Sequence, residues 1–270
     1  MDDLHLKKTK LEEYIGSLGK VAVAFSSGVD STFLLKACHD TLGEDAIAIT
    51  MKTVSVPERE LEESIAFCEK EGIKQLIIEV DQIAIEGFED NPPDRCYICK
   101  RALFSKMVSV AEKNGFAHIA EGSNTDDMGD YRPGMKAISE LGIKSPLREA
   151  GLSKADIREL SKELGLPTWN KPSFACLATR FVYGEKIIVE KLRMIELAEQ
   201  RLMDLGFSQF RVRCHGDIAR IEIEPEEFEK ILSSDTAISI NRYLQELGFR
   251  YVTLDLGGYA TGSMNKALEK

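Results

Sequence analysis

Short apolar runs and stretches of helical periodicity alternate along the first 170 residues. The run 21–25 is wholly apolar and ends at a turn, which is typical of a strand buried on both faces of a parallel sheet. Similar runs follow at 46–49, 76–80 and 117–120. Amphipathic stretches lie between these runs at 30–42, 57–71 and 100–113. Strands that alternate with helices of this length predict βαβ units, and therefore an α/β fold whose parallel sheet has helices on both faces.

A helix with clear termini marks the end of this alternating region. Ser153 and Asp156 have the spacing of a capping box, Gly165 lies where the chain leaves the helix, and Pro167 prevents continuation. We therefore predict two domains, 1–170 and 171–270. The second has the pattern of a small α+β domain. Its expected helices cover 186–205 and 225–232, with one more helix before the last strand. Its expected strands cover 210–213, 218–223 and 251–254.

The composition limits the classes of function. The chain has 270 residues, with 45 acidic and 35 basic side chains and a formal net charge of −10. Such a charge repels a phosphate backbone, so we expect no nucleic-acid partner. No apolar stretch approaches the ~20 residues that cross a bilayer, and the first residues lack the pattern of a secretory signal, so we expect no membrane association. Six cysteines are too few for a disulfide scaffold, which favours a cytoplasmic protein.

The turn after the first apolar run has the composition of an anion-binding loop. Residues 25–32 read Phe-Ser-Ser-Gly-Val-Asp-Ser-Thr between an expected strand and an expected helix. Small residues let backbone N–H groups converge, serine hydroxyls add hydrogen bonds, and the helix N-terminus favours negative charge. Asp30 suggests Mg²⁺ mediation or a helix cap. A tight turn with an N-cap is the alternative, but α/β folds bind ligands at the carboxyl ends of parallel strands.

This loop resembles one known phosphate-binding motif and not two others. It has neither the Walker spacing nor the G-x-G-x-x-G spacing. It resembles the PP-loop, S-G-G-x-D-S, of the ATP pyrophosphatase superfamily, whose members cleave ATP between the α and β phosphates and transfer AMP. Ser27 stands where that motif has glycine, and a positive φ there would cost serine ~1 kcal/mol. The resemblance implies ATP binding by Ser26, Ser27, Gly28, Asp30 and Ser31.

Three cysteines lie in motifs rather than in amphipathic helices. Cys96 and Cys99 form a C-x-x-C at an expected loop-to-helix junction, and Cys176 lies within 171–180. The pair alone is compatible with a redox dithiol, two metal ligands or a structural role. Three thiolates with a fourth open position suit an iron–sulfur cluster, whereas structural zinc normally requires a fourth protein ligand. The remaining cysteines are expected in the core, namely Cys38, Cys68 and Cys214.

Six segments in order resemble the LarE family, the ATP-dependent sulfur transferases of nickel-pincer cofactor synthesis for lactate racemase. They are 26–31, 51–57, 121–127, 129–134, 144–147 and 171–180. The resemblance covers nearly the whole chain and implies an adenine-nucleotide alpha-hydrolase-like fold. It implies that the enzyme adenylates the carboxylates of pyridinium-3,5-biscarboxylic acid mononucleotide, and that sulfur then displaces AMP to leave thiocarboxylates.

The same resemblance implies cofactors, site residues and an assembly. In part of the family the cysteine matching Cys176 gives up its own sulfur, whereas members with three cysteines hold a [4Fe-4S] cluster that delivers sulfide. This chain has three, so we expect a cluster on Cys96, Cys99 and Cys176, with a sacrificial Cys176 as the alternative. Met51 is expected at the ATP site and Asp30 at Mg²⁺. A homo-oligomer, a ring of six subunits, is also implied.

The phosphate of a mononucleotide substrate requires cations. Arg180, Arg211 and Arg213 are the candidates, because a guanidinium suits bidentate phosphate contacts. Arg211 and Arg213 project from one face of an expected strand. The alternative is a solvated strand face. Glu196 or Glu199 is expected to orient these arginines.

Two other functions share some of these features. A tRNA thiolase also has a PP-loop and sometimes a three-cysteine cluster. The acidic charge and the lack of a basic, aromatic-interleaved stretch argue against RNA as a partner. A non-catalytic adenine-nucleotide module would bind ATP without hydrolysis, and its cysteines would be structural. Of the three, we expect the sulfur transferase.

Overall fold

The computed structural model describes residues 2–129, 133–174 and 176–268. The chain forms two compact units. The first comprises Met1–Asp81 and Cys96–Phe174, and the second comprises Gln82–Arg95 and Ala175–Lys270. The segment Gln82–Arg95 therefore belongs with the C-terminal part of the chain, which the sequence pattern did not indicate.

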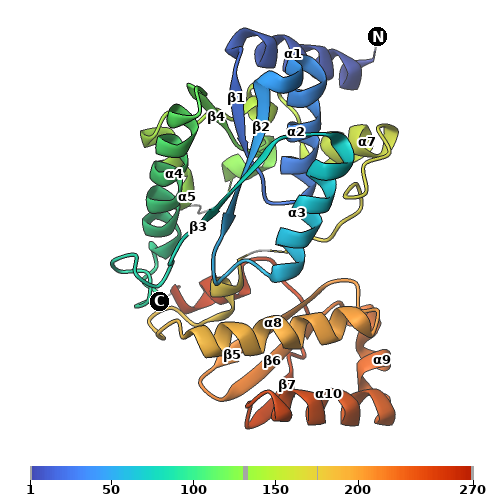
Figure 1. Cartoon of the computed structure of the whole chain (residues 1–270). Coiled ribbons are helices and arrows are strands. Elements are labelled where there is room, and N and C mark those ends of the chain that lie inside the picture. Colours follow the sequence, from blue (N-terminus) through green and yellow to red (C-terminus); the bar gives the residue numbers. More distant parts are fainter. Residues whose placement is uncertain (1, 130–132, 175, 269–270) are drawn as a thin grey trace. The chain divides into compact units, whose positions relative to one another are not determined.

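The first unit is built on a four-stranded parallel sheet (Figure 1). Its strands are β1 Val21–Ala24, β2 Ala46–Lys52, β3 Gln75–Glu79 and β4 His118–Ala120, in the order β3-β2-β1-β4. Every neighbouring pair is parallel, and Val21 lies opposite Ala46 on one side and opposite His118 on the other. The predicted parallel sheet is therefore confirmed.

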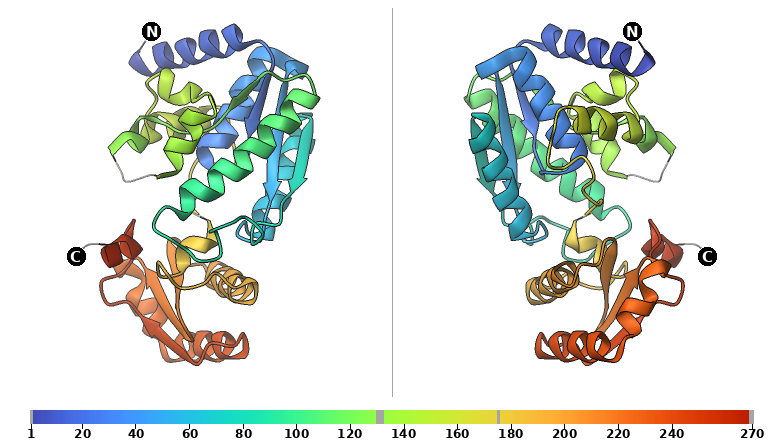
Figure 2. Two further views of the ribbon diagram at one scale, coloured as in Figure 1. Left: turned by 90° about the vertical axis from the view of Figure 1, so that its left-hand side faces the viewer. Right: turned by 90° about the vertical axis from the view of Figure 1, so that its right-hand side faces the viewer.

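Helices cover both faces of this sheet (Figures 1 and 2). They are α1 Asp3–Leu18, α2 Val29–Leu42, α3 Glu58–Glu71, α4 Arg95–Lys113, α5 Pro133–Glu140, α6 Pro146–Glu149 and α7 Lys154–Glu163. Side chains point alternately to the two faces of a sheet, so β1 contributes residues to a hydrophobic core on each face. Val21 and Val23 pack in the cluster that contains residues of α1, α2, α3 and α7. Ala22 packs in the other, with residues of α4 and α5.

The second unit is a small α+β domain, as predicted. Its sheet has the order β5-β6-β7, with β5 Phe210–His215, β6 Ile218–Ile223 and β7 Tyr251–Leu254. The first two strands are antiparallel, and β6 and β7 are parallel. Its helices are α8 Val189–Asp204, α9 Phe228–Leu232 and α10 Ser234–Glu246.

Helix termini agree with the sequence at α7 and differ at α4. Ser153 and Asp156 form the predicted capping box, and Gly165 has a φ of +65° where the chain leaves the helix. The helix expected from residue 100 instead begins at Arg95, whose N–H donates to the carbonyl of Pro92. The C-x-x-C motif therefore lies inside the first turns of α4.

Within the described ranges, no helix is long and apolar enough to cross a membrane.

Candidate active site

The predicted phosphate loop connects the carboxyl end of β1 to the N-terminus of α2. Gly28 is the N-cap residue of α2, and no side chain caps the helix there. The N–H of Ser26 donates to Ser31 Oγ at 3.3 Å, and the two hydroxyl oxygens lie 3.1 Å apart. The small side chains thus fold back onto the loop and leave its backbone and the start of α2 available to an anion.

Ser27 has the conformation for which its motif normally uses glycine. Its φ is +54°, so the position does require a positive φ. Two contacts hold it there: Ser27 Oγ donates to the carbonyl of Glu60 at 3.0 Å, and Lys171 Nζ donates to the carbonyl of Ser27 at 3.0 Å. Lys171 is in turn ion-paired with Glu63. These bonds offset the strain of ~1 kcal/mol that serine brings.

The segment after β4 forms a second wall beside the loop. From β1 the strands β2 and β3 are added toward one edge of the sheet. The next strand, β4, pairs with the opposite edge of β1, so the direction of strand addition reverses at β1. Ligands bind at such a switch point in open α/β sheets. Gly122 comes so close to the loop that a Cβ there would lie 3.0 Å from the N atom of Ser31. Glu121 is buried beside it and accepts hydrogen bonds from Ser123 and Ser145.

The carboxylate of Asp30 is held by two side chains from distant segments. Lys154 Nζ lies 2.5 Å from Asp30 Oδ2, and Asn124 Nδ2 donates to Oδ1 at 3.4 Å. The N–H of Lys154 donates to Asp126, which fixes the start of α7 to the segment after β4. Sequence reasoning missed Lys154 and Asn124 as site residues. Lys154 simply follows a capping serine, and nothing local points to a partner 124 residues away.

These segments enclose a cavity of about 350 Å³. This volume lies within the range of ~300–1,000 Å³ that is usual for small-molecule sites. The predicted ATP-site residues that line it are Ser26, Gly28, Asp30, Ser31 and Met51. Ser27 acts differently, because its hydroxyl turns to Glu60 and shapes the loop. The cavity therefore brings together the loop and Met51 from the end of β2.

Lys100 of α4 also lines the cavity, and sequence reasoning did not select it. A Cβ on Gly134 would lie only 2.6 Å from Lys100 Cδ, so glycine leaves room for the lysine stem. The carboxylates that line the cavity include those of Asp30 and Asp127. Mg²⁺ usually takes one or two carboxylates together with substrate phosphates, so this set fits a magnesium ion that arrives with ATP. Nowhere in the described chain do three His, Cys, Asp or Glu side chains gather to hold a metal by themselves.

The three motif cysteines are divided between the two units. Cys96 and Cys99 lie one helical turn apart in α4, so their side chains share one face of the helix. Cys96 is half-buried and Cys99 is buried. Cys176 is exposed in the second unit, at the N-cap of the short 3₁₀ helix Leu177–Arg180. Two thiols one turn apart fit two ligand positions of a cluster.

The other three cysteines occupy the core, as predicted. Cys38, Cys68 and Cys214 are all buried. Burial raises the pKa of Cys38 and of Cys68 to about 12, and that of Cys214 to about 11. Of the segment 129–134, one of those that carry the family resemblance, Asp130, Tyr131 and Arg132 lie outside the described residues.

Arg180 is fully buried and has a two-point ion pair with Glu199 of α8. Its Nε and Nη2 lie 2.6 and 3.0 Å from the carboxylate oxygens. Burial raises the pKa of Glu199, but Arg180, Arg211 and the N–H of Val212 together outweigh this effect, and the pKa lies below its ordinary value. The predicted orienting role of Glu199 is confirmed for Arg180. Glu196 instead pairs with Arg193.

Arg211 and Arg213 are buried as well, which excludes a solvated strand face. They are 3% and 5% exposed. Arg213 Nε and Nη2 both donate to Oε2 of Glu222, at 3.0 and 2.9 Å. Burial and the charge of Arg180 lower the pKa of Arg211 to about 10, and burial also lowers the pKa of Arg213. The three predicted phosphate ligands are therefore together in one buried cluster.

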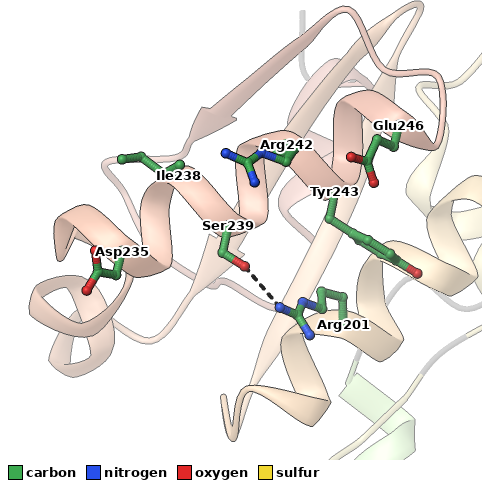
Figure 3. A pocket seen from close by; sticks show the side chains of 7 residues that line it. All are labelled: Arg201, Asp235, Ile238, Ser239, Arg242, Tyr243 and Glu246. Atoms are coloured by element: carbon green, nitrogen blue, oxygen red, sulfur yellow. Dashed lines mark hydrogen bonds between the residues drawn. The ribbon is translucent and has the colours of Figure 1, made fainter.

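A second cavity of about 350 Å³ lies along α10 in the same unit (Figure 3). Arg201 of α8 donates to Ser239 Oγ at 2.9 Å, and its guanidinium lies 5.7 Å from the ring centre of Tyr243. These contacts join α10 to α8. The cavity is lined by two arginines and two carboxylates, so its charges balance, and it contains none of the predicted site residues.

Comparison with known proteins finds a family model that matches the first unit and relatives that match nearly the whole chain. Residues 5–112 match the NAD synthase family model. An uncharacterized protein of Synechocystis is 40% identical over 99% of this chain and 100% of its own length. Pyridinium-3,5-bisthiocarboxylic acid mononucleotide synthase of Lactiplantibacillus plantarum is 39% identical over 100% of this chain and 98% of its own length. An uncharacterized protein of Methanocaldococcus jannaschii is 32% identical over 89% of this chain.

Similarity over both units goes beyond a shared phosphate loop, because the matched length spans the cysteine segment and the arginine cluster as well. With its PP-loop fold and a full-length enzyme relative, the chain belongs to the LarE family of ATP-dependent sulfurtransferases.

Proposed function

We propose that the protein converts the carboxylates of pyridinium-3,5-biscarboxylic acid mononucleotide to thiocarboxylates in the synthesis of the nickel-pincer nucleotide cofactor of lactate racemase. The observation that carries this proposal is the full-length similarity to the Lactiplantibacillus plantarum synthase, which covers both the PP-loop unit and the arginine-rich unit. The cavity at the carboxyl ends of β1 and β2 supports ATP as the co-substrate.

The first step is adenylation. A substrate carboxylate oxygen attacks the α-phosphorus of ATP, the bond to the β-phosphate breaks, and pyrophosphate leaves. A carboxylate alone is a poor electrophile because oxide would have to leave, whereas AMP leaves readily from the mixed anhydride. Sulfur then bonds to the carboxyl carbon as AMP departs, and a second cycle acts on the other carboxylate.

The cavity residues suit the first of these steps. The loop amides and the N-terminus of α2 would bind phosphate oxygens, and Lys100 and Lys154 supply positive charge nearby. Asp30 would hold Mg²⁺, which neutralises the charge that develops on pyrophosphate. Lys154 is paired with Asp30, so its ammonium group lies close to the carboxylate that would hold the metal.

For the sulfur source we propose a [4Fe-4S] cluster held by Cys96, Cys99 and Cys176. The three thiolates would hold such a cluster, which would supply the sulfide to be delivered. The one-turn spacing of Cys96 and Cys99 and the exposure of Cys176 support these three as ligands. Sacrifice of Cys176 itself is the competing version of the same reaction.

We further propose that Arg180, Arg211 and Arg213 bind the substrate phosphate. The lowered pKa of Arg211 supports this, because burial and the positive charge of Arg180 outweigh the compensating charge of Glu199. The proposal includes a homo-oligomer of six subunits, a cytoplasmic location and no nucleic-acid partner. The acidic net charge of −10 supports the last point.

Two measurements on anaerobically purified protein test this function. Pyrophosphate release with the pyridinium substrate, independent of RNA, is the expected result, and RNA-dependent release would favour a tRNA thiolase. About four irons and matching acid-labile sulfide per chain are expected for a [4Fe-4S] cluster, with loss of both in Cys96→Ala. No iron in either protein would return Cys176 to the sacrificial role.

A further inference from the structure

The C-terminal segment Tyr259–Asn265 contacts the arginine face of the second sheet. Arg211 and Arg213 share one face of β5, and the β6 residues opposite them are Glu222 and Arg220. Arg211 lies 5.1 Å from the ring centre of Tyr259. Arg213 donates to Ser263 Oγ at 3.0 Å, and Arg220 donates to the sulfur of Met264 at 3.4 Å. The segment therefore contacts three arginines in turn.

Each of the three proposed phosphate ligands also donates to one hydroxyl oxygen. Arg180 Nη1 donates to Thr179 Oγ1 at 2.7 Å, Arg213 Nη2 to Ser263 Oγ at 3.0 Å, and Arg211 Nη2 to the Tyr259 hydroxyl at 3.5 Å. A phosphate monoester offers three terminal oxygens. Three hydroxyl oxygens thus occupy guanidinium donors that such a ligand would use, and two of them belong to the C-terminal segment.

The chemistry of these acceptors decides which of them can be exchanged. Glu199 and Glu222 are carboxylates in two-point contact with their arginines, so a phosphate gains little by displacing them. The three hydroxyls are neutral, so they lack the Coulomb attraction that a phosphate anion has for a guanidinium. Ser263 Oγ also donates to Glu222 Oε1 at 2.7 Å, and Glu222 keeps its arginines when that bond is released. A phosphate would therefore replace the hydroxyls and leave the ion pairs in place.

The backbone of the segment is attached at one end. The N–H of Tyr259 donates to the carbonyl of Ile223 at 2.8 Å, and a Cβ on Gly258 would lie 3.0 Å from Pro225. Beyond that anchor, the backbone bonds of 260–265 in the described chain are local, from Ser263 to Ala260 and from Asn265 to Gly262. The rest of the segment is held by side chains, which can be released without breaking the sheet.

We infer that Tyr259–Asn265 is an autoinhibitory strap whose hydroxyls stand in for phosphate oxygens on Arg211 and Arg213, and that a phosphorylated ligand must displace it to bind. The inference rests on the proposed phosphate site and adds a competition to it. A residue that merely lined the site would strengthen phosphate binding, whereas the strap opposes it, so the two roles predict opposite signs.

The experiment measures binding of inorganic phosphate to the full chain by calorimetry, beside a Tyr259→Phe/Ser263→Ala double variant. Phenylalanine keeps the ring over Arg211, so mainly the two hydroxyls are removed. We expect the double variant to bind phosphate about tenfold more tightly, which corresponds to about 1.4 kcal/mol. Ser208→Ala is the matched control, since it removes a hydroxyl that contacts Glu227 and no arginine. It should leave phosphate affinity unchanged.

Amide hydrogen exchange of the wild-type chain supplies a second readout that needs no variant. Phosphate is expected to speed exchange in 260–265 and to slow it in β5. Slower exchange in 260–265, or weaker binding by the double variant, would overturn the strap and make the hydroxyls ligands. Arg211→Ala tests the proposed phosphate site separately from the strap. Phosphate affinity that is unaffected by this change would overturn the proposed phosphate site itself, and the strap with it.

Discussion

Lys171 Nζ donates to the backbone oxygen of Ser27 at 3.0 Å, across 144 residues of sequence. That oxygen belongs to the one loop residue with a positive φ, and the same ammonium is paired with Glu63. Lys171 is also the first residue of the segment 171–180, which contains Cys176. The phosphate loop is therefore held in shape by the stretch of chain that precedes the third motif cysteine.

Lys171→Met should weaken both ATP binding and the fold. The Ser27 carbonyl and Glu63 lose their donor, and the side chain is only 13% exposed, so the expected loss of unfolding free energy is about 1–3 kcal/mol. We expect the apparent KM for ATP to rise about tenfold, measured by pyrophosphate release. Lys162→Met is the control, because that exposed lysine lies over Trp169 and away from the loop. Equal effects of the two changes would contradict this prediction.

Substitutions at Ser27 should separate backbone strain from hydrogen bonding. Ser27→Ala keeps the positive φ and loses the bond to Glu60, whereas Ser27→Gly loses the same bond but relieves the strain. Glycine should therefore be the more stable of the two by about 1 kcal/mol, in urea unfolding at one pH. A less stable glycine variant would mean that the loop relaxes when the bond to Glu60 is lost.

Asp30→Asn should lower the rate of AMP transfer by about 100-fold or more while the protein remains folded. The amide can still accept a hydrogen bond from Lys154, but it lacks the charge required for Mg²⁺. Pyrophosphate release and thermal unfolding measure the two effects. Asp40→Asn, at the far end of α2, removes a carboxylate that pairs with Lys36 and should leave the rate unchanged.

Glu199→Gln should destabilise the second unit by about 3 kcal/mol at neutral pH, because it leaves the buried charge of Arg180 without its partner. The pKa of Glu199 in the folded state lies below its unfolded value of 4.5. Its contribution is therefore fully present above about pH 4.5 and is lost as the pH falls through the folded pKa. The difference in unfolding free energy between wild type and variant should shrink below pH 4.5. Glu196→Gln, one turn away, should show neither effect.

Cys176→Ala should permit adenylation but abolish thiocarboxylate formation. Both versions of the sulfur step require this thiol, whereas the PP-loop cavity does not include it. Pyrophosphate release and mass spectrometry of the pyridinium product check the two halves. A variant that still makes thiocarboxylate would remove Cys176 from the mechanism.

Much of the fold was accessible from local pattern. The apolar run of β1 lies between two cores and carries no polar face, so its parallel, covered position follows from composition alone. The capping box at Ser153 was equally local. The strand order and the membership of Gln82–Arg95 in the second unit were not, since both depend on contacts between distant residues.

The site also has residues that the local sequence predicted and residues that only the structure revealed. Ser26 to Ser31 form a local motif, and the positive φ of Ser27 could be anticipated from the glycine that it replaces. Lys154 and Lys171 could not, because each acts through a partner more than 120 residues away. Arg180 was found by its residue type and Glu199 by its spacing, but nothing in the sequence indicated that Arg180 would be fully buried.

The three core cysteines give this enzyme a chemical selectivity. With pKa values of about 11 or 12, less than about one thousandth of Cys38, Cys68 or Cys214 is thiolate at neutral pH, and only the thiolate is nucleophilic. The electrophilic acyl adenylate of the proposed first step would therefore find three of the six cysteines unreactive. An electrophilic label should likewise modify the three motif cysteines and leave the three core cysteines unmodified, so none of the core cysteines needs to be replaced.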